Sequence, residues 1–184
     1  MKILLHICCG PCATWPVEAL REAGHDVTGF WYNPNVHVYQ EYARRLAAAR
    51  SFAEQVDLDL IVHDEYGLAE FVQAAPSRKA ERCPVCYAMR LKRTAAAARD
   101  GHFEAFTSTL LVSPHQDHEL IRTIGEQAAT EVGVALYYED FRPGFKRHRE
   151  LADRYGLYRQ QYCGCIYSEY ERFGPKQKEE HTNR

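Results

Sequence analysis

The first segment of the chain, Lys2 to Cys8, constrains the fold more than any other feature. Its sequence, KILLHIC, lacks the alternation of apolar and polar residues that marks a strand with one face in water. A nearly continuous apolar run of this length is typical of a strand buried on both faces, and such strands occur in parallel sheets covered by helices. The segment is therefore predicted to be a central strand, with His6 as a hydrogen-bonded histidine of the core.

Strand-like and helix-like segments alternate along the rest of the chain. Four more strands are predicted at residues 26–32, 58–63, 103–107 and 134–138. Two helices are predicted to have a proline in the first turn: one from Thr14 to Gly24 with Pro16, and one from Cys83 to Asp100 with Pro84 as its first helical residue. Further helices are predicted at 39–56, 66–74, 113–131 and 151–158. This order predicts an α/β fold: a parallel five-stranded sheet in the order 3-2-1-4-5 with helices on both faces. The segments after strands one and four would then border one crevice.

Composition sets limits on the function. With 184 residues and 46% hydrophobic content, the chain is expected to form a single domain over 1–175, followed by a charged tail at 176–184. The net charge of -2 excludes a uniformly basic nucleic-acid binder, although local basic clusters can still bind phosphates. No apolar stretch approaches the roughly 20 residues that a membrane helix needs. Because the apolar start is also too short for a signal peptide, we expect a cytoplasmic protein without a membrane partner.

Seven cysteines are many for a cytoplasmic chain, where disulfides are rare and clustered thiols indicate metal or redox chemistry. They form three groups: Cys8, Cys9 and Cys12 after the first strand, then Cys83 and Cys86, then Cys163 and Cys165. The fourth strand is followed by polar residues, Thr107, Ser108 and Thr109. These residues are expected to face the first cysteine group across the crevice.

Two kinds of metal site fit this cysteine pattern. Zinc fits because Cys9 with Cys12, and Cys83 with Cys86, have the CxxC spacing of structural zinc sites. An iron–sulfur cluster held by Cys8, Cys9, Cys83 and Cys86 fits better, because an adjacent pair can bind two corners of a cuboidal cluster where the backbone turns sharply. A helix starting at Cys83 would also stabilise the thiolates of that pair. Cys12 is then free to bind a second metal, to act as a thiol, or to pack as a small apolar residue.

Two further features bear on the chemistry. Cys163 and Cys165 flank one glycine, and such a pair can form a strained, easily reduced disulfide, so we predict a redox pair. Basic and aromatic residues alternate at 141–149, which suits a nucleic acid whose target base is unstacked. The chain has no GxxxxGK[ST] motif, so phosphate chemistry driven by ATP is not predicted.

Six motifs are spread over nearly the whole chain. They are LHICCGPC at 5–12, FWYNPN at 30–35, ERCPVCYAMRL at 81–91, FTSTLLVSP at 106–114, DFRPGF at 140–145 and YRQQYCGCIYS at 158–168. Each motif is unspecific by itself. Together they resemble the cobalamin-independent epoxyqueuosine reductases, the QueH family.

The resemblance implies a fold similar to the adenine nucleotide alpha hydrolase group, the HUP fold, and a [4Fe-4S] cluster with an additional mononuclear iron beside it. The matching cluster ligands are Cys8, Cys9, Cys83 and Cys86. The implied reaction is the reductive removal of the epoxide oxygen from epoxyqueuosine at the wobble position of tRNA with a GUN anticodon. Two electrons from an external donor and two protons would yield an alkene, which completes queuosine, and water.

The resemblance also suggests roles for single residues. Family members carry aspartate where this chain has Cys12, so Cys12 is expected to bind the second iron, with Asp140 as an alternative. The expected substrate-binding residues are Tyr32, Asn33, Asn35, Thr107, Ser108, Thr109 and Arg142. Two alternative functions remain open: a zinc-stabilised tRNA-binding module without redox activity, and a thiol oxidoreductase that uses the pair Cys163 and Cys165.

Overall fold

Five parallel strands form the centre of the computed structural model, which describes residues 1–175. The strands are β1 (Lys2–His6), β2 (Asp26–Trp31), β3 (Leu60–Val62), β4 (Ala105–Ser108) and β5 (Ala135–Leu136). Their order is β3-β2-β1-β4-β5, which confirms the predicted topology. β1 is central and pairs with β2 and β4, and its apolar residues are completely buried. His6 is also buried, and its ring bonds to Ser108 Oγ and to the Tyr32 carbonyl, as expected of a core histidine.

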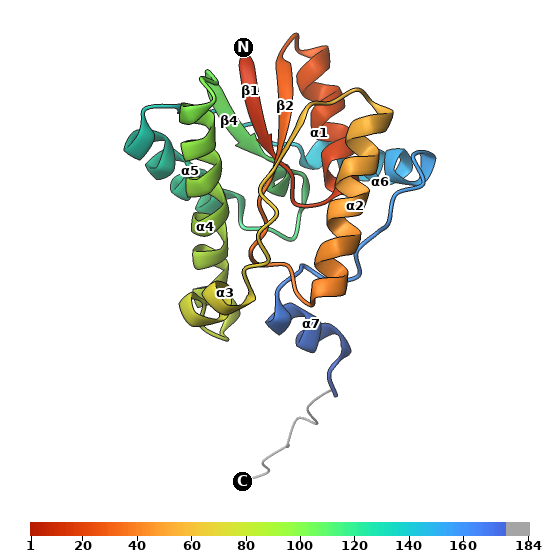
Figure 1. Ribbon diagram of the computed structural model, residues 1–184, viewed down its shortest axis with the longest axis vertical. Helices are drawn as coiled ribbons and strands as arrows, with labels where there is room; N and C mark the ends of the chain where they lie inside the picture. The colour runs from red at the N-terminus through yellow and green to blue at the C-terminus, as the bar shows by residue number, and fades with distance from the viewer. Residues whose placement is uncertain (176–184) are drawn as a thin grey trace.

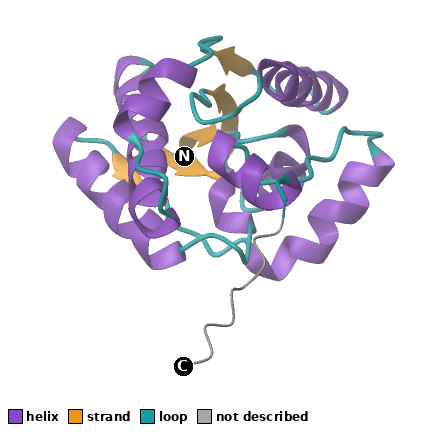
Figure 2. Ribbon diagram, turned by 90° about the horizontal axis from the view of Figure 1, so that it is seen from below, coloured by secondary structure: helices purple, strands orange, loops and turns teal. Residues whose placement is uncertain are grey.

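Helices cover both faces of this sheet. They are α1 (Gly10–Glu22), α2 (Tyr39–Gln55), α3 (Leu68–Ala74), α4 (Lys79–Asp100), α5 (His118–Val132), α6 (Phe145–Arg154) and α7 (Ile166–Phe173), with 3-10 turns η1 (Thr109–Val112) and η2 (Arg142–Gly144). Helices α1, α2 and α6 lie on one side of the strands, and α4 and α5 lie on the other (Figure 1). The view along the strands from below shows the sheet enclosed between these two helical layers (Figure 2). The α/β class is therefore confirmed.

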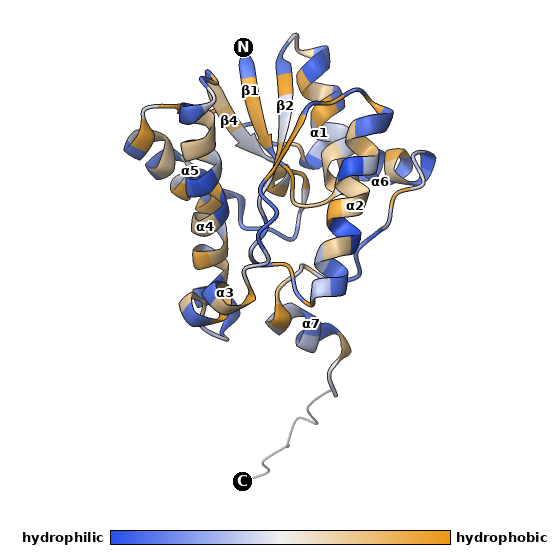
Figure 3. Ribbon diagram, viewed as in Figure 1, coloured by the Kyte–Doolittle hydropathy of each residue, from blue (hydrophilic) through white to orange (hydrophobic). Residues whose placement is uncertain are grey.

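Hydropathy follows these layers. β1 is hydrophobic after its charged first residue, β2 passes from blue through orange to nearly white, and α2 and α5 carry both hydrophilic and hydrophobic residues (Figure 3). A strand enclosed on both sides needs apolar residues on both faces, while a covering helix needs only one apolar stripe. Among the described residues, no helix is long and apolar enough to cross a membrane. The predicted tail at 176–184 lies outside the described residues.

Two helices begin earlier than the sequence predicted, each before a proline. α1 begins at Gly10 rather than Thr14, so Pro16 lies inside the helix. α4 begins at Lys79 rather than at Cys83, and Pro84 likewise lies inside it. A proline inside a helix removes one backbone hydrogen bond, but contacts with other elements can outweigh that cost.

The added turn of α4 has such a contact. Arg82 is buried, and both oxygens of the Glu171 carboxylate accept from its Nη2 atom at 2.7 Å, while Nη1 donates to the Ser77 carbonyl. These bonds link α4 to α7, a helix that the sequence did not predict. Cys83 therefore lies within the helix and does not cap it.

Helices α5 and α6 also begin at residues other than those predicted. The cap of α5 is Asp117, whose carboxylate accepts from the backbone N–H of Leu120 at 3.0 Å. Ser113, the predicted cap, accepts instead from the N–H of His115 in the preceding turn. α6 begins at Phe145 instead of residue 151. Local capping rules could not separate Asp117 from Ser113, because both residue types are good N-caps.

The capping difference gives a stability prediction. Asp117→Ala is expected to lower the free energy of unfolding by about 1 kcal/mol, the typical cost of losing an N-cap. Ser113→Ala, the matched control, removes a hydroxyl that caps no α-helix and should cost less. Urea denaturation of both variants measures the difference, and equal losses would contradict the assignment of the cap.

His37 ties the loop after β2 to the start of α7. Its Nδ1 accepts from the backbone N–H of Ile166 at 3.2 Å, and its Nε2 donates to the Pro34 carbonyl at 3.0 Å. Because one ring nitrogen accepts while the other donates, the ring makes both bonds only when it is neutral. Burial lowers the pKa of His37 to about 4.

Protonation of His37 should therefore destabilise the fold. The folded pKa lies below the ordinary value of 6.5, so the stabilisation is complete above pH 6.5 and is lost as the pH falls from 6.5 towards about 4. Urea denaturation of the wild type and of His37→Gln across this window measures the effect. The wild type should lose stability more steeply than the variant, and parallel pH dependences would count against this role.

Candidate metal centre

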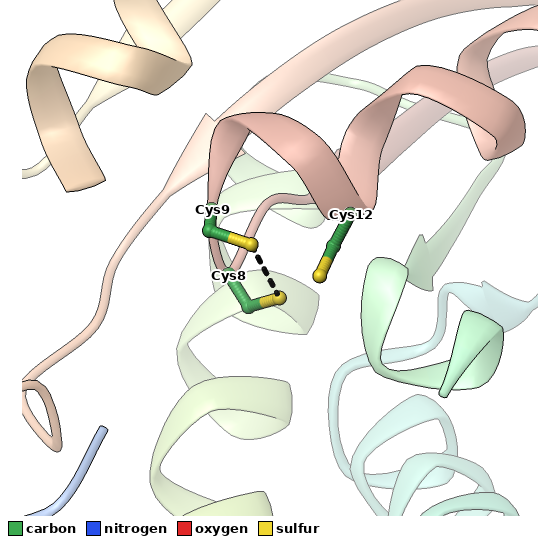
Figure 4. A group of neighbouring side chains, drawn as sticks. All are labelled: Cys8, Cys9 and Cys12. Carbon is green, nitrogen blue, oxygen red and sulfur yellow. Dashed lines mark hydrogen bonds between the residues drawn. The ribbon is translucent and has the colours of Figure 1, made fainter. Parts of the chain in front are cut away.

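Three cysteines gather where β1 passes into α1. The Sγ atoms of Cys8, Cys9 and Cys12 all lie within 4.8 Å of one another, and those of Cys8 and Cys9 are 3.8 Å apart (Figure 4). Cys9 is the N-cap of α1, and Cys12 lies in its first turn. The start of α1 approaches α2 so closely that Gly10 is needed there, because a Cβ would lie 2.5 Å from the backbone oxygen of Ala48. The set is a soft-donor group that could hold a metal.

Thr109 connects the end of β4 to this group. Its Oγ1 accepts from the backbone N–H of Cys8 at 3.0 Å and contacts the Cys8 Sγ at 3.2 Å, where it can donate. The two neighbouring candidates face the core instead: Ser108 bonds to His6, and the buried Thr107 hydroxyl has no partner. Thr107 and Ser108 belong to β4 itself rather than to the segment after it, and of the three predicted residues Thr109 is the one that contacts a cysteine of the group.

The three thiols differ in acidity. Hydrogen bonds from Cys12 and Cys9, with a further one from Thr109, hold the pKa of Cys8 well below its usual value. The same contact with Cys8 raises the pKa of Cys12, and burial raises that of Cys9. Cys8 is thus the thiol of this group that most readily becomes a thiolate, the form that binds metals.

The second cysteine pair lies on α4. Burial raises the pKa of Cys83, and it raises that of Cys86 to about 12. The expectation that a helix start stabilises these thiolates is therefore wrong, because α4 begins at Lys79, before both of them. The buried Arg90 favours the Cys86 thiolate, since its Nη2 contacts the Cys86 Sγ at 3.0 Å.

The third pair lies in the loop before α7. Arg45 holds this loop, because Nη1 donates to the Cys163 carbonyl and Nη2 to the Tyr162 carbonyl, both at 2.9 Å. Cys163 is exposed and Cys165 is buried, and the Cys165 Sγ caps α7 by accepting from a backbone N–H. All seven cysteines lie in the described part of the chain and have free thiols there, so the redox pairing stays a prediction.

A cavity of about 480 Å³ has Cys8, Cys12 and Cys163 in its lining, whereas the other four cysteines are absent from it. This volume is in the range of ligand pockets, about 300–1,000 Å³. Phe145 forms an aromatic part of the lining, with its ring centroid 4.8 Å from that of His148 and 6.1 Å from that of His115. A pocket with thiols and aromatic rings in one lining can hold a planar ring system next to a bound metal.

Several predicted substrate residues do not reach this cavity. Tyr32, Asn33 and Asn35 are absent from its lining, and the Asn33 side chain donates to the Ile7 carbonyl instead. Asp140 and Arg142 are absent as well and bond to each other, with Arg142 Nη2 2.7 Å from the carboxylate. That arginine lowers the pKa of Asp140 to about 2. The structure therefore does not bring Asp140 to the cysteines.

Other residues at the cavity were missed by the sequence analysis. They are Arg45, Arg90, Gln116, Phe145, His148 and Gln160. The basic and aromatic pattern at 141–149 covered Phe145 and His148, and the motifs at 81–91 and 158–168 contain Arg90 and Gln160 without indicating a role for either. Gln160 Nε2 contacts the Cys12 Sγ at 3.5 Å across 148 positions of sequence, a contact that depends on the packing of the fold.

Comparison with known proteins finds relatives over nearly the whole chain. The family model described as epoxyqueuosine reductase QueH matches residues 3–171 and so includes every cysteine. The chain belongs to the QueH family. An epoxyqueuosine reductase QueH of Dehalococcoides mccartyi is 41% identical over 173 residues, which cover 94% of this chain and 95% of the relative. The QueH proteins of Histophilus somni and Thermotoga maritima are 35% and 32% identical and cover 91% and 92% of this chain, or 72% and 91% of their own lengths.

Proposed function

We propose that this chain is a cobalamin-independent epoxyqueuosine reductase that acts on tRNA in the cytoplasm. The reaction takes two electrons from an external donor and two protons, breaks both carbon–oxygen bonds of the epoxide, and yields an alkene and water. The observation that carries the proposal is the cavity whose lining joins Cys8 and Cys12 to aromatic side chains, in a chain of the QueH family. Free thiols throughout the chain suit a reducing compartment.

The donor set suits an iron–sulfur centre. Cys8, Cys9, Cys83 and Cys86 would hold a [4Fe-4S] cluster, and Cys12 would face a second iron. Thiolates are the usual ligands of such clusters. The separate role of Cys12 is supported by its position in the cavity lining, which it shares with Cys8. When bound, the cluster supplies electrons one at a time, and an iron with an open position polarises the epoxide oxygen.

The residues of the chain would bind and orient the modified base. A base must leave the anticodon stack to enter a pocket, and aromatic side chains can replace the lost stacking. Phe145 has this position in the cavity lining, between His115 and His148. Arg149 and Arg159 belong to the same lining and can neutralise phosphates of the anticodon loop.

Phe145→Ala tests the stacking role. Loss of one base–aromatic contact costs about 1–3 kcal/mol, so KM for the tRNA should rise by about tenfold for each 1.4 kcal/mol lost. Tyr170→Ala is the control, since Tyr170 is an exposed aromatic residue of α7 outside the cavity lining. Steady-state kinetics measures both variants, and an unchanged KM in Phe145→Ala would place the base elsewhere.

The reductase activity itself is tested on tRNA that carries epoxyqueuosine. Anaerobically purified protein, reconstituted with iron and sulfide, is incubated with this tRNA and dithionite, and the nucleosides are analysed by mass spectrometry. Loss of one oxygen atom from the modified nucleoside is expected. Unchanged epoxyqueuosine with a protein that holds its cluster would reject the proposed reaction. A protein that binds the tRNA but holds zinc in place of iron would indicate the tRNA-binding module.

A further inference from the structure

Arg90 is a buried cation that lacks an acidic partner. Its side chain extends from α4 into the cavity lining, and the residue is only 3% exposed. Nε donates to the Cys86 carbonyl at 3.1 Å, and Nη2 contacts the Cys86 Sγ at 3.0 Å. Within residues 1–175, no aspartate or glutamate forms an ion pair with it. A buried charge without compensation is strongly destabilising, so a partner of opposite charge is expected in the working protein.

Among the described residues, the other two buried arginines have acidic partners. Arg45 pairs with the Glu41 carboxylate at 2.7 Å, and Arg82 pairs with that of Glu171 at 2.7 Å. Within residues 1–175, Arg90 contacts the Cys86 sulfur in place of a carboxylate, and its guanidinium carbon lies 5.9 Å from the centroid of the Tyr87 ring. An arginine guanidinium does not lose its proton in proteins, whether or not the neighbouring thiols are ionised. Arg90 therefore stays charged next to sulfur.

We propose that Arg90 is a positioning residue that compensates the negative charge of the iron–sulfur centre and raises its reduction potential. This inference rests on the proposed function, because it assumes that Cys86 is a cluster ligand. Each one-electron reduction adds one negative charge to the cluster, while Arg90 keeps all its protons in both states. A nearby cation and an N–H···S bond both stabilise the reduced form more than the oxidised form, so both raise the potential.

Potentiometric titration of the loaded enzyme, followed by electron paramagnetic resonance, tests this role. Arg90→Gln should lower the equilibrium constant for one-electron reduction at least about tenfold, which corresponds to ~59 mV. Arg90→Lys keeps the charge and should give an intermediate potential. Arg93→Gln is the matched control: it removes one positive charge from the same helix, but its side chain is exposed and contacts His63. Equal potentials in the wild type, Arg90→Gln and Arg93→Gln would overturn the proposal.

If Arg90→Gln does not fold, a measurement on the wild type tests whether Arg90 contacts the cluster. Protein labelled with ¹⁵N in the arginine guanidinium groups should show hyperfine coupling between the reduced cluster and a labelled nitrogen, and Arg90→Lys should abolish it. No coupling in the wild type would contradict the N–H···S contact. A wild type without any cluster would instead refute the proposed function, so the two failures are distinguishable.

Discussion

Replacing Cys8 by serine is expected to abolish both iron binding and epoxyqueuosine reduction. Cys8 has the lowest thiol pKa of the first cysteine group, and it contacts both Cys9 and Thr109. A hydroxyl is a hard donor that binds iron–sulfur clusters poorly. Mutation of residues that only contact the metal ligands already lowers metal affinity or activity about 10–100-fold. Loss of a ligand itself should therefore lower the activity by more than about 100-fold.

The matched control for this prediction is Cys163→Ser. Cys163 is exposed and reaches the same cavity, but it is not a proposed cluster ligand. Iron content and visible absorbance should therefore stay near wild type in this variant. Both variants are checked for folding by circular dichroism. Retention of iron and activity by a folded Cys8→Ser variant would refute the assignment of Cys8.

Gly10→Ala is expected to lower both the stability and the iron content. Alanine normally stabilises a helix relative to glycine by about 0.5–1 kcal/mol. At Gly10, however, the new Cβ would lie 2.5 Å from the Ala48 oxygen and 2.7 Å from its carbonyl carbon, and these backbone atoms cannot rotate away. Overpacking of this kind costs about 1–3 kcal/mol. The clash should therefore outweigh the gain and push the start of α1, with Cys9, away from α2.

Gly24→Ala separates this effect from a general loss of stability. Gly24 follows the C-cap of α1 with a φ of +81°, and no heavy atom beyond Gly24 and its two chain neighbours lies within 4 Å of the position that its Cβ would take. Alanine is strained at this φ, so the variant should lose stability of about 1–2 kcal/mol but keep its iron. Urea denaturation and iron analysis of both variants test the difference. Full iron content in Gly10→Ala would show that the cysteines do not depend on this contact.

The sequence predicted the sheet better than the helix starts. The apolar segment Lys2 to Cys8 and the alternation that follows it were sufficient for the observed strand order, because a strand buried on both faces has few alternatives. Pro16 and Pro84 misled the prediction, since a proline in the first turn is a common start signal. The real start of α4 depends on the bonds of Arg82 to Glu171 and Ser77, which no local pattern reveals.

The centre was predictable where it depends on cysteine spacing and the topology of the sheet. Cys8, Cys9, Cys12 and Thr109 come together because two neighbouring strands end at one edge. Arg90 was not recognised, because a charged residue on a helix is usually exposed and its burial against Cys86 depends on the packing of α4. The sequence therefore predicted the candidate ligands, but not the charged residues that surround them.

The central claim is that the cysteines hold a [4Fe-4S] cluster with a second iron beside it. Quantification of iron, acid-labile sulfide and zinc in protein purified without oxygen tests this claim most directly. We expect equal amounts of iron and sulfide from the cluster plus one further iron per chain, with little zinc. Stoichiometric zinc without sulfide would contradict it.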